Sequence, residues 1–415
     1  MTDTSKDPQH FPCLRNLQFA PLKQGEDQYV ALWDGTGVSA EKLIIPMNYF
    51  FLLQHCDGEH SLEQLGVLYL KKFGEFLMPD KIQRLIADMD AKLFLESERV
   101  EAAKRAALEA YRALSVRPAV YAGRSYEGDR EKLRAQLEGF LRSKEGPESK
   151  PSDNAGQPIK GLIAPHYELK DAGPIYAWAY KELQEAAQPD LFVVLGVGHT
   201  GFEYPFALTD KDFETPLGRV RTERVIVDQI KQAAGPSCFK GEVAHGHAHS
   251  IEFQLPWLQH VMGEKPFTIV PILCAFPPEF AAAPELRELA QHIESFLGLL
   301  KEAIAATGRE VCVIASAELA HIGMRYGDRE PPTDFSFHRC LQQDLAMLKY
   351  VETLDAKGFA EFILKEGDAR RITGFAAIYS LLSLIKAEKG QVLRYDRSIT
   401  DQYNSTVTYA AMAFF

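Results

Sequence analysis

From about residue 160 onward, the chain alternates short apolar runs with longer amphipathic segments. Apolar runs of this length are typical of buried strands, and apolar residues at helical spacing fill the segments between them. Helices are expected near residues 177–184, 225–233 and 286–305. The expected strands are GLIAPH from Gly161, LFVVLGVGH from Leu191, TIVPILCAF from Thr268 and EVCVIASAELAH from Glu310. This alternation predicts an α/β fold with a largely parallel sheet flanked by helices.

The first part of the chain has a different pattern. An extended, alternating segment at residues 28–33 comes before a helix expected at residues 49–56. Ser61 and Gln64 fit a capping box, in which each side chain satisfies a backbone N–H of the other residue at the start of a second helix. A third helix follows, and Phe94-Leu95 is expected to begin a closing strand. This order predicts a small winged-helix domain.

The change of pattern also suggests where the domains divide. We expect an N-terminal domain of residues 1–110 and a second domain of residues 111–415, joined by a charged helical stretch at 101–114. A length of 415 residues fits two units better than a single core.

Composition narrows the possible partners. The chain has 46 basic and 57 acidic side chains, a net charge of −11, and lacks a Lys/Arg run that could contact nucleic acid. A signal peptide and an apolar run of membrane-spanning length are also missing, so we expect a cytoplasmic protein with neither a nucleic-acid nor a membrane partner. The six cysteines form no C-x-x-C pair and are expected to be buried free thiols.

Three histidines stand where chemistry is expected. His166, His199 and His321 each follow the end of a strand-like run. A single histidine at a strand end is more often a hydrogen-bonded core imidazole than a ligand. Ligands of open α/β sheets, however, bind at the carboxyl ends of the strands, so three such histidines in one sheet favour a shared site.

A fourth candidate, His249, closes a histidine-rich segment that also contains His245 and His247. An exposed turn explains His245 and His247 as well as a functional role does. Only His249 is taken as a site candidate. Ser250 beside it lacks the context of a hydrolase nucleophile, which makes nucleophilic hydrolysis the least favoured activity.

Seven segments together resemble the Memo family in order and approximate spacing. The family is similar in fold to class III extradiol dioxygenases, and its bacterial members include protein B of the AmmeMemoRadiSam system, which is associated with a radical-SAM protein. The segment at residues 49–97 also resembles PqqD-like domains, which recognise peptides. The seven segments are Arg117-Pro118-Ala119-Val120, Ala122-Gly123-Arg124, Ile163-Ala164-Pro165-His166, Leu195-Gly196 with His199, Glu214-Thr215-Pro216-Leu217-Gly218, His249-Ser250-Ile251-Glu252 with Gln254-Leu255-Pro256, and Ser405 with Val407 and Tyr409-Ala410-Ala411.

The resemblance assigns roles to the candidate residues. It makes His166 and His199 ligands of a divalent metal, iron in particular, and places Thr373 at the third ligand position, where the family has cysteine. His321 matches a pocket histidine that would act as acid or base. His249 and Glu318 complete the catalytic set, Glu318 standing where the family has aspartate.

The departures from the family leave two functions open. Because a threonine hydroxyl is a far weaker ligand than a thiolate, the metal depends on another anion, for which Glu318 is the best candidate. The first function is an iron-dependent redox enzyme that acts with a radical-SAM partner, on a peptide bound by the N-terminal domain. The alternative is an inactive, peptide- or protein-binding member of the family that has lost its metal, with the winged helix as a structural appendage.

Overall fold

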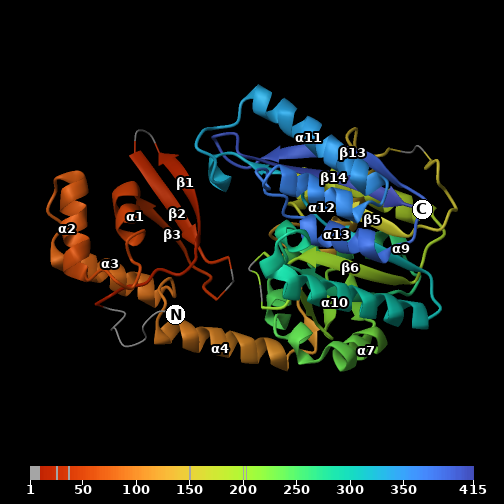
Figure 1. Ribbon diagram of the computed structural model, residues 1–415, viewed down its shortest axis with the longest axis horizontal. Coiled ribbons are helices and arrows are strands. Elements are labelled where there is room, and N and C mark those ends of the chain that lie inside the picture. The colour runs from red at the N-terminus through yellow and green to blue at the C-terminus, as the bar shows by residue number, and fades with distance from the viewer. Residues whose placement is uncertain (1–9, 25–26, 36–37, 149–150, 200, 202) are drawn as a thin grey trace. The chain divides into compact units, whose positions relative to one another are not determined.

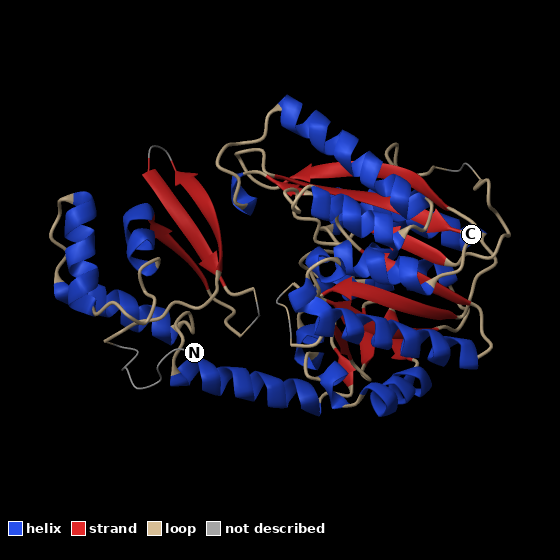
Figure 2. Cartoon of the chain, viewed as in Figure 1, coloured by secondary structure: helices blue, strands red, loops and turns tan. Residues whose placement is uncertain are grey.

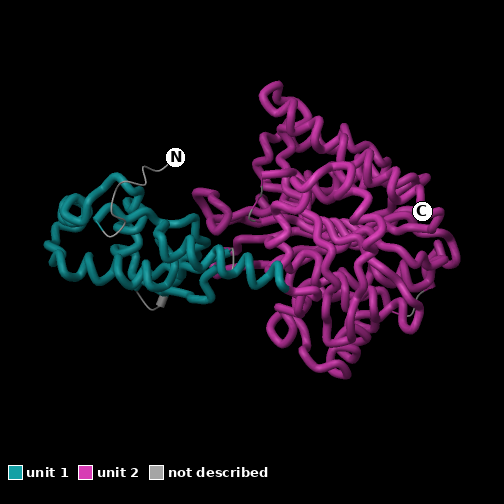
Figure 3. Tube along the Cα trace, turned by 90° about the horizontal axis from the view of Figure 1, so that it is seen from below, with its two compact units in different colours: residues 1–113 teal, residues 114–415 magenta. Residues whose placement is uncertain are grey.

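The computed structural model describes residues 10–24, 27–35, 38–148, 151–199, 201 and 203–415. The chain forms two compact units, Met1–Ala113 and Leu114–Phe415 (Figure 3). The expected division at residue 110 falls within helix α4 (Glu98–Ala113), close to the end of the first unit. Among the described residues, no helix combines the length and apolarity needed to cross a membrane.

The first unit is a small antiparallel sheet followed by helices (Figure 1). Strand β2 lies between β1 and β3. The unit has its own apolar core, which includes Val30, Leu53 and Leu65. The elements are β1 (Gln18–Gln24), β2 (Asp27–Trp33), β3 (Lys42–Pro46), α1 (Met47–Leu53), α2 (Leu62–Phe73), α3 (Pro79–Ala91) and α4.

Two local predictions for this unit have different outcomes. The capping box is confirmed: Ser61 Oγ accepts from the Gln64 backbone N–H, and the Gln64 side chain accepts from the Ser61 N–H at 2.7 Å. The closing strand at Phe94-Leu95 is wrong. Leu95 forms a single antiparallel bridge with Leu14, and both Phe94 and Leu95 are buried in the core.

The described part of the second unit contains an 11-stranded sheet with a parallel centre. Strands β5, β11, β6, β10 and β9 lie side by side and run parallel, which confirms the predicted sheet. Antiparallel strands extend it at both ends. The strands are β4 (Val116–Arg117), β5 (Gly161–Ala164), β6 (Leu191–Val197), β7 (Phe206–Leu208), β8 (Asp212–Thr215), β9 (Gly218–Thr222), β10 (Thr268–Cys274), β11 (Val311–Ser316), β12 (His321–Ile322), β13 (Gly390–Ile399) and β14 (Thr406–Phe414).

Helices cover both faces of this sheet (Figure 2). Alternate side chains of each central strand enter one of two cores: Val193 packs with α7, α10, α11, α12 and α13, whereas Val194 packs with α5, α6, α8 and α9. The helices are α5 (Arg130–Leu141), α6 (Leu169–Glu185), α7 (Arg224–Ala234), α8 (His249–Glu252), α9 (Gln254–Met262), α10 (Arg287–Ala306), α11 (Asp334–Glu352), α12 (Ala356–Lys365) and α13 (Phe375–Leu384). Short 3-10 helices lie at Pro236–Phe239, Glu242–Gly246, Pro278–Ala281, Pro284–Leu286 and Met324–Tyr326.

Four of the six cysteines lie in these two cores. All six are free thiols, as predicted, and all except Cys13 are buried. Cys274 and Cys312 lie on central strands, where burial raises the pKa of each thiol. Both act as small apolar core residues.

Candidate metal centre

Three of the predicted site histidines gather at the carboxyl edge of the parallel sheet. His166 follows β5, His199 follows β6, and His249 is the first residue of α8. One ring nitrogen from each lies within 4.8 Å of those of the other two. The rings of His199 and His249 are stacked with their centroids 4.9 Å apart. Among the described His, Cys, Asp and Glu side chains, these three form the group that could hold a metal ion.

The environment of His166 prepares it to be a ligand. Its Nδ1 lies 3.0 Å from the Ser316 carbonyl oxygen, so Nδ1 carries the proton and donates it there. Burial lowers the pKa of His166, which keeps the imidazole neutral near pH 7. Its buried Nε2 has no hydrogen-bond partner among the described residues. A fixed tautomer with an unused lone pair is the arrangement that metal-binding histidines show in proteins.

Glu318 supplies a buried negative charge beside this group. Its Oε2 lies 3.7 Å from His166 Nε2 and 3.2 Å from His321 Nε2. Burial alone would raise the pKa of Glu318, but His166 and the hydrogen bond from His321 lower it to about 2. A buried carboxylate has to be paired or bound to a metal, and its nearest partners here are imidazoles. The site therefore favours a cation.

His321, the first residue of β12, contacts the Glu318 carboxylate. Its Nδ1 lies 3.2 Å from the Leu319 carbonyl oxygen, while its Nε2 faces the Glu318 carboxylate. Because a neutral imidazole has only one N–H, it satisfies one of these acceptors at a time. The tautomer with its proton on Nε2 donates to the Glu318 carboxylate. The edge of the Tyr326 ring packs against the imidazole, with centroids 4.9 Å apart.

The site residues match the pattern of a known family. The profile described as Memo-like protein matches residues 117–413, which include every predicted site residue. The chain belongs to the Memo family. This confirms the resemblance to the Memo family.

Named relatives cover the chain to different extents. A MEMO1 family protein from Methanopyrus kandleri is 31% identical over 302 residues, which are 72% of this chain and 98% of that protein. A MEMO1 family protein from Thermotoga neapolitana is 30% identical over 275 residues, 65% of this chain and 88% of that protein. One from Aquifex aeolicus is 24% identical over 402 residues, 96% of this chain and 99% of that protein. The similarity to the Aquifex protein therefore extends into the first unit.

Within the Memo domain, a buried ion pair fixes the helix that carries His249. Glu252, at the other end of α8, pairs with Arg117, and both side chains are completely buried. Glu252 also accepts from the Tyr126 hydroxyl at 2.5 Å and from the Tyr121 N–H at 2.8 Å. Burial, and then the neighbouring His166, lower the pKa of His249 to about 3. His249 is therefore a neutral, firmly positioned imidazole.

A second hydrogen-bond network holds the strand ends together. The Gln254 side-chain amide donates to the Pro165 carbonyl and to Ser316 Oγ, both at 2.7 Å. Ser316 Oγ in turn donates to the Ser250 carbonyl. Gln254 lies in one of the Memo-like motifs of the sequence but had no predicted role, and Ser316 was not predicted. Both residues are close in sequence to predicted site residues, and this closeness could have indicated their role.

The Thr373-Gly374 turn lies against the strand end that carries Glu318. The Gly374 N–H donates to the Glu318 carbonyl at 2.9 Å. A Cβ on Gly374 would lie 2.6 Å from the Ala317 Cβ, and closer still to the Glu318 carbonyl, so only glycine fits. The Thr373 hydroxyl is buried and has no hydrogen-bond partner in the described part of the chain. Thr373 therefore stays a predicted ligand. His249, which was predicted as a catalytic residue, lies in the group of histidines that could hold the metal.

Neighbouring candidates have structural explanations. His245 is fully buried, and its Nε2–H donates to the Ala207 carbonyl at 2.9 Å. His247 is exposed. Ser250 Oγ donates to the Val197 carbonyl and accepts from the Val197 N–H, so its hydroxyl has a structural role. The exposed turn is therefore confirmed for His247 and wrong for His245, whose imidazole is buried in the core.

Proposed function

We propose that this Memo-family chain is a non-haem, iron-dependent redox enzyme whose metal is held by His166, His199 and His249. The observation that carries the proposal is the group of three ring nitrogens within 4.8 Å of one another. One of these histidines, His166, has a buried Nε2 with no hydrogen-bond partner among the described residues. Three neutral imidazoles on Fe(II) leave positions open to other ligands, and bound iron would supply one-electron chemistry with dioxygen, as in non-haem oxygenases with few protein ligands.

Glu318 and His321 are the proton-handling pair of this proposal. His321 Nε2 lies 3.2 Å from Glu318 Oε2, so the imidazole is positioned to pass a proton to or from a substrate beside a carboxylate that keeps its charge. Glu318 also places a negative charge 3.7 Å from the nitrogen that faces the metal position. It can therefore balance part of a divalent charge, or bind the ion directly in place of the family cysteine.

Thr373 contributes at most a neutral oxygen to this centre. Its buried, unpartnered hydroxyl supports a place at the site, but a hydroxyl remains protonated where a cysteine thiol would ionise on a metal. We therefore propose that the site binds iron more weakly than it would with cysteine at this position.

The test is anaerobic titration with Fe(II), followed by nitric oxide. Calorimetry should show one Fe(II) per chain, and nitric oxide should give the half-integer-spin signal of an iron nitrosyl in electron paramagnetic resonance, because an open position remains. His321→Ala should keep both signals, since His321 is not a ligand. Binding of iron without the nitrosyl signal would argue against the redox role.

We also propose a radical-SAM protein as partner and a peptide as substrate, with the first unit presenting the peptide. In its described sheet, β1 and β3 are outer strands, each paired on one side only. Exposed apolar side chains lie on or near this unit's strands and helices, among them Phe19, Ile44 and Phe76. An extended peptide can add to such an edge as a further strand. On a peptide array, the full-length Ile44→Ser variant should no longer bind the peptides that bind wild-type protein.

The replacement of the family cysteine by Thr373 favours the alternative, a member that has lost its metal and only binds peptides or proteins. This alternative predicts that Fe(II) does not bind above the level of a His166→Ala/His199→Ala variant. The two functions therefore give opposite results in the same titration.

A further inference from the structure

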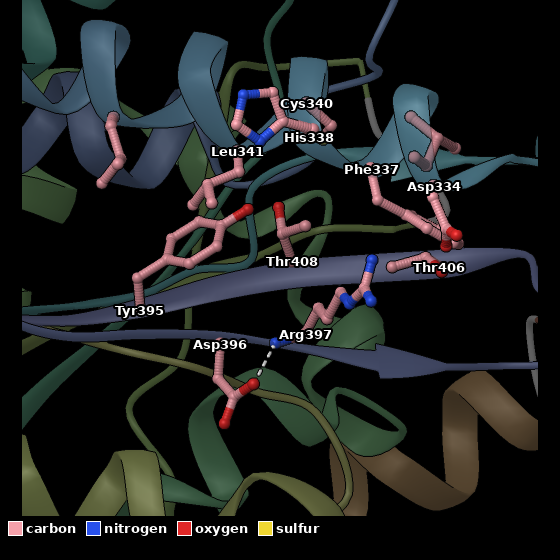
Figure 4. Close-up of a pocket in the computed structure, with 12 residues that line it drawn as sticks. Asp334, Phe337, His338, Cys340, Leu341, Tyr395, Asp396, Arg397, Thr406 and Thr408 are labelled. Carbon is pink, nitrogen blue, oxygen red and sulfur yellow. Dashed lines mark hydrogen bonds between the residues drawn. The ribbon is translucent and has the colours of Figure 1, made fainter.

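A cavity lies in the Memo domain, between helix α11 and strands β12, β13 and β14. Its volume is about 560 Å³, within the range of small-molecule sites. Figure 4 shows α11 above it, with Tyr395 and Arg397 rising from β13 toward the helix while Asp396 points away. None of the proposed metal ligands lines it. We propose that this groove, between α11 and β12–β13–β14, binds an apolar carboxylic acid, with its hydrocarbon body inside and its carboxylate on Arg397.

The inner part of the groove is apolar because its polar atoms are already used. The Thr408 and Tyr395 hydroxyls both donate to Asp344 Oδ2, at 2.6 and 2.8 Å. Asp344 is fully buried and is paired with Arg370. These side chains therefore present mainly carbon to the cavity, beside Leu341 from α11. Hydrocarbon can enter here without displacing a hydrogen bond.

The outer part offers a cation without an anionic partner. Arg397 is exposed, and its guanidinium makes no ion pair or hydrogen bond to any described residue. It lies over the Phe337 ring, 4.0 Å from the centroid. A guanidinium stacked on an aromatic face keeps its in-plane N–H groups available, and their fork matches a carboxylate. Arg397 is thus oriented but not neutralised.

Two carboxylates, Asp334 and Asp396, also line the groove and limit the ligand, and Asp396 points away from the helix (Figure 4). Asp334, in the first turn of α11, also lines the groove and would repel an anion placed close to it. A ligand with one acidic group on Arg397 and an uncharged body avoids that repulsion better than a diacid does. His338 lies on the same helix and provides a further ring contact. The favoured class is therefore a monocarboxylic acid with an aliphatic or aromatic body.

The groove connects to the strand end that carries His321. Thr408 Oγ1, on the groove floor, accepts from the Ala320 N–H at 2.8 Å, and the His321 N–H donates to the Arg370 carbonyl at 2.6 Å. The buried Asp344 joins Thr408 and Arg370. Hydrogen bonds therefore join the lining of the groove to the backbone at Ala320 and His321. The binding proposal itself does not depend on metal or turnover.

The experiment is isothermal titration of full-length protein with decanoate, decanol and decylamine, which share a chain and differ in the head group. Decanoate should bind more tightly than decanol, and decylamine least tightly. Arg397→Gln should weaken decanoate binding about tenfold, because a charge-assisted contact is lost, and leave decanol unchanged. Asp334→Asn should strengthen decanoate binding, because it removes a repulsive charge.

Arg394→Gln is the matched control, since Arg394 is an exposed arginine of the same strand that does not line the groove. It should bind decanoate like wild type. The proposal is overturned if wild type does not bind decanoate, if Arg397→Gln binds it equally well, or if Arg394→Gln loses affinity to the same extent. Preference for decylamine over decanoate would also overturn it.

Discussion

The buried pair of Arg117 and Glu252 allows the sharpest prediction about stability. Glu252 holds the end of α8 opposite His249, and its carboxylate accepts from Arg117, Tyr126 and the Tyr121 N–H. Glu252→Gln keeps the shape of the side chain but removes its charge. The fully buried guanidinium of Arg117 then loses its only described carboxylate partner.

The expected loss follows from burial. Removing one member of a fully buried ion pair costs about 3–5 kcal/mol, because the remaining charge is left uncompensated away from water. For the second unit, which has about 300 residues, that corresponds to a fall in the thermal midpoint of roughly 5–8 °C. Arg117 also donates to the His245 and Ala248 carbonyls. Because these contacts remain in Glu252→Gln, we expect a loss of stability near the lower end of this range.

The assay is thermal unfolding followed by circular dichroism, with Glu361→Gln as control. Glu361 pairs with Lys357 on the surface of α12, and its loss should leave the midpoint unchanged. A double variant, Arg117→Met/Glu252→Gln, should be more stable than the sum of the two single losses predicts. If Glu252→Gln unfolds at the wild-type midpoint, the pair does not anchor α8 and the reasoning fails.

Three further predictions concern single residues. Burial lowers the pKa of His245 to about 3 in the folded state, while the unfolded side chain titrates near 6.5, so the protein should become less stable as the pH drops below about 6.5. The loss by pH 5 is at most about 2 kcal/mol, and His245→Gln should lose less stability than wild type between pH 7 and pH 5 in unfolding experiments. Gly374→Ala should lower metal affinity and stability together, measured by Fe(II) titration and urea unfolding, because its Cβ collides with the Ala317 side chain; unchanged values would show that the turn can move. Thr373→Cys should tighten Fe(II) binding at least about tenfold, measured by competition with a chelator, and an unchanged affinity would place residue 373 outside the ligand set.

The sheet could be predicted because its strands are buried on both faces. Continuous apolar runs such as Leu191–Val197 are the signature of central parallel strands, and each predicted run became one. The antiparallel ends were harder to predict from the pattern. Strand β13 is half exposed and mixes polar with apolar residues, and β12 has only two residues. The closing strand at Phe94-Leu95 failed because two buried apolar residues also fit a core-filling loop.

The site was predicted in part for the same reason. Strand ends mark His166, His199 and Glu318, and the parallel order of β5, β11 and β6 brings them together. The place of His249 among the ligand nitrogens depends on the Glu252 anchor, a contact between segments more than 100 residues apart in sequence. Spacing along the chain carries no information about such a contact.

The central claim is that three histidines hold one metal, and metal content tests it most directly. Iron and zinc should be quantified by mass spectrometry in anaerobically purified wild type, His166→Ala, His199→Ala and His249→Ala. His292→Ala, an exposed histidine of α10, serves as the control. The account predicts close to one iron per chain in wild type and in the control, and a large loss in each of the three site variants. Metal that is absent from wild type, or retained when the three site histidines are replaced, would contradict it.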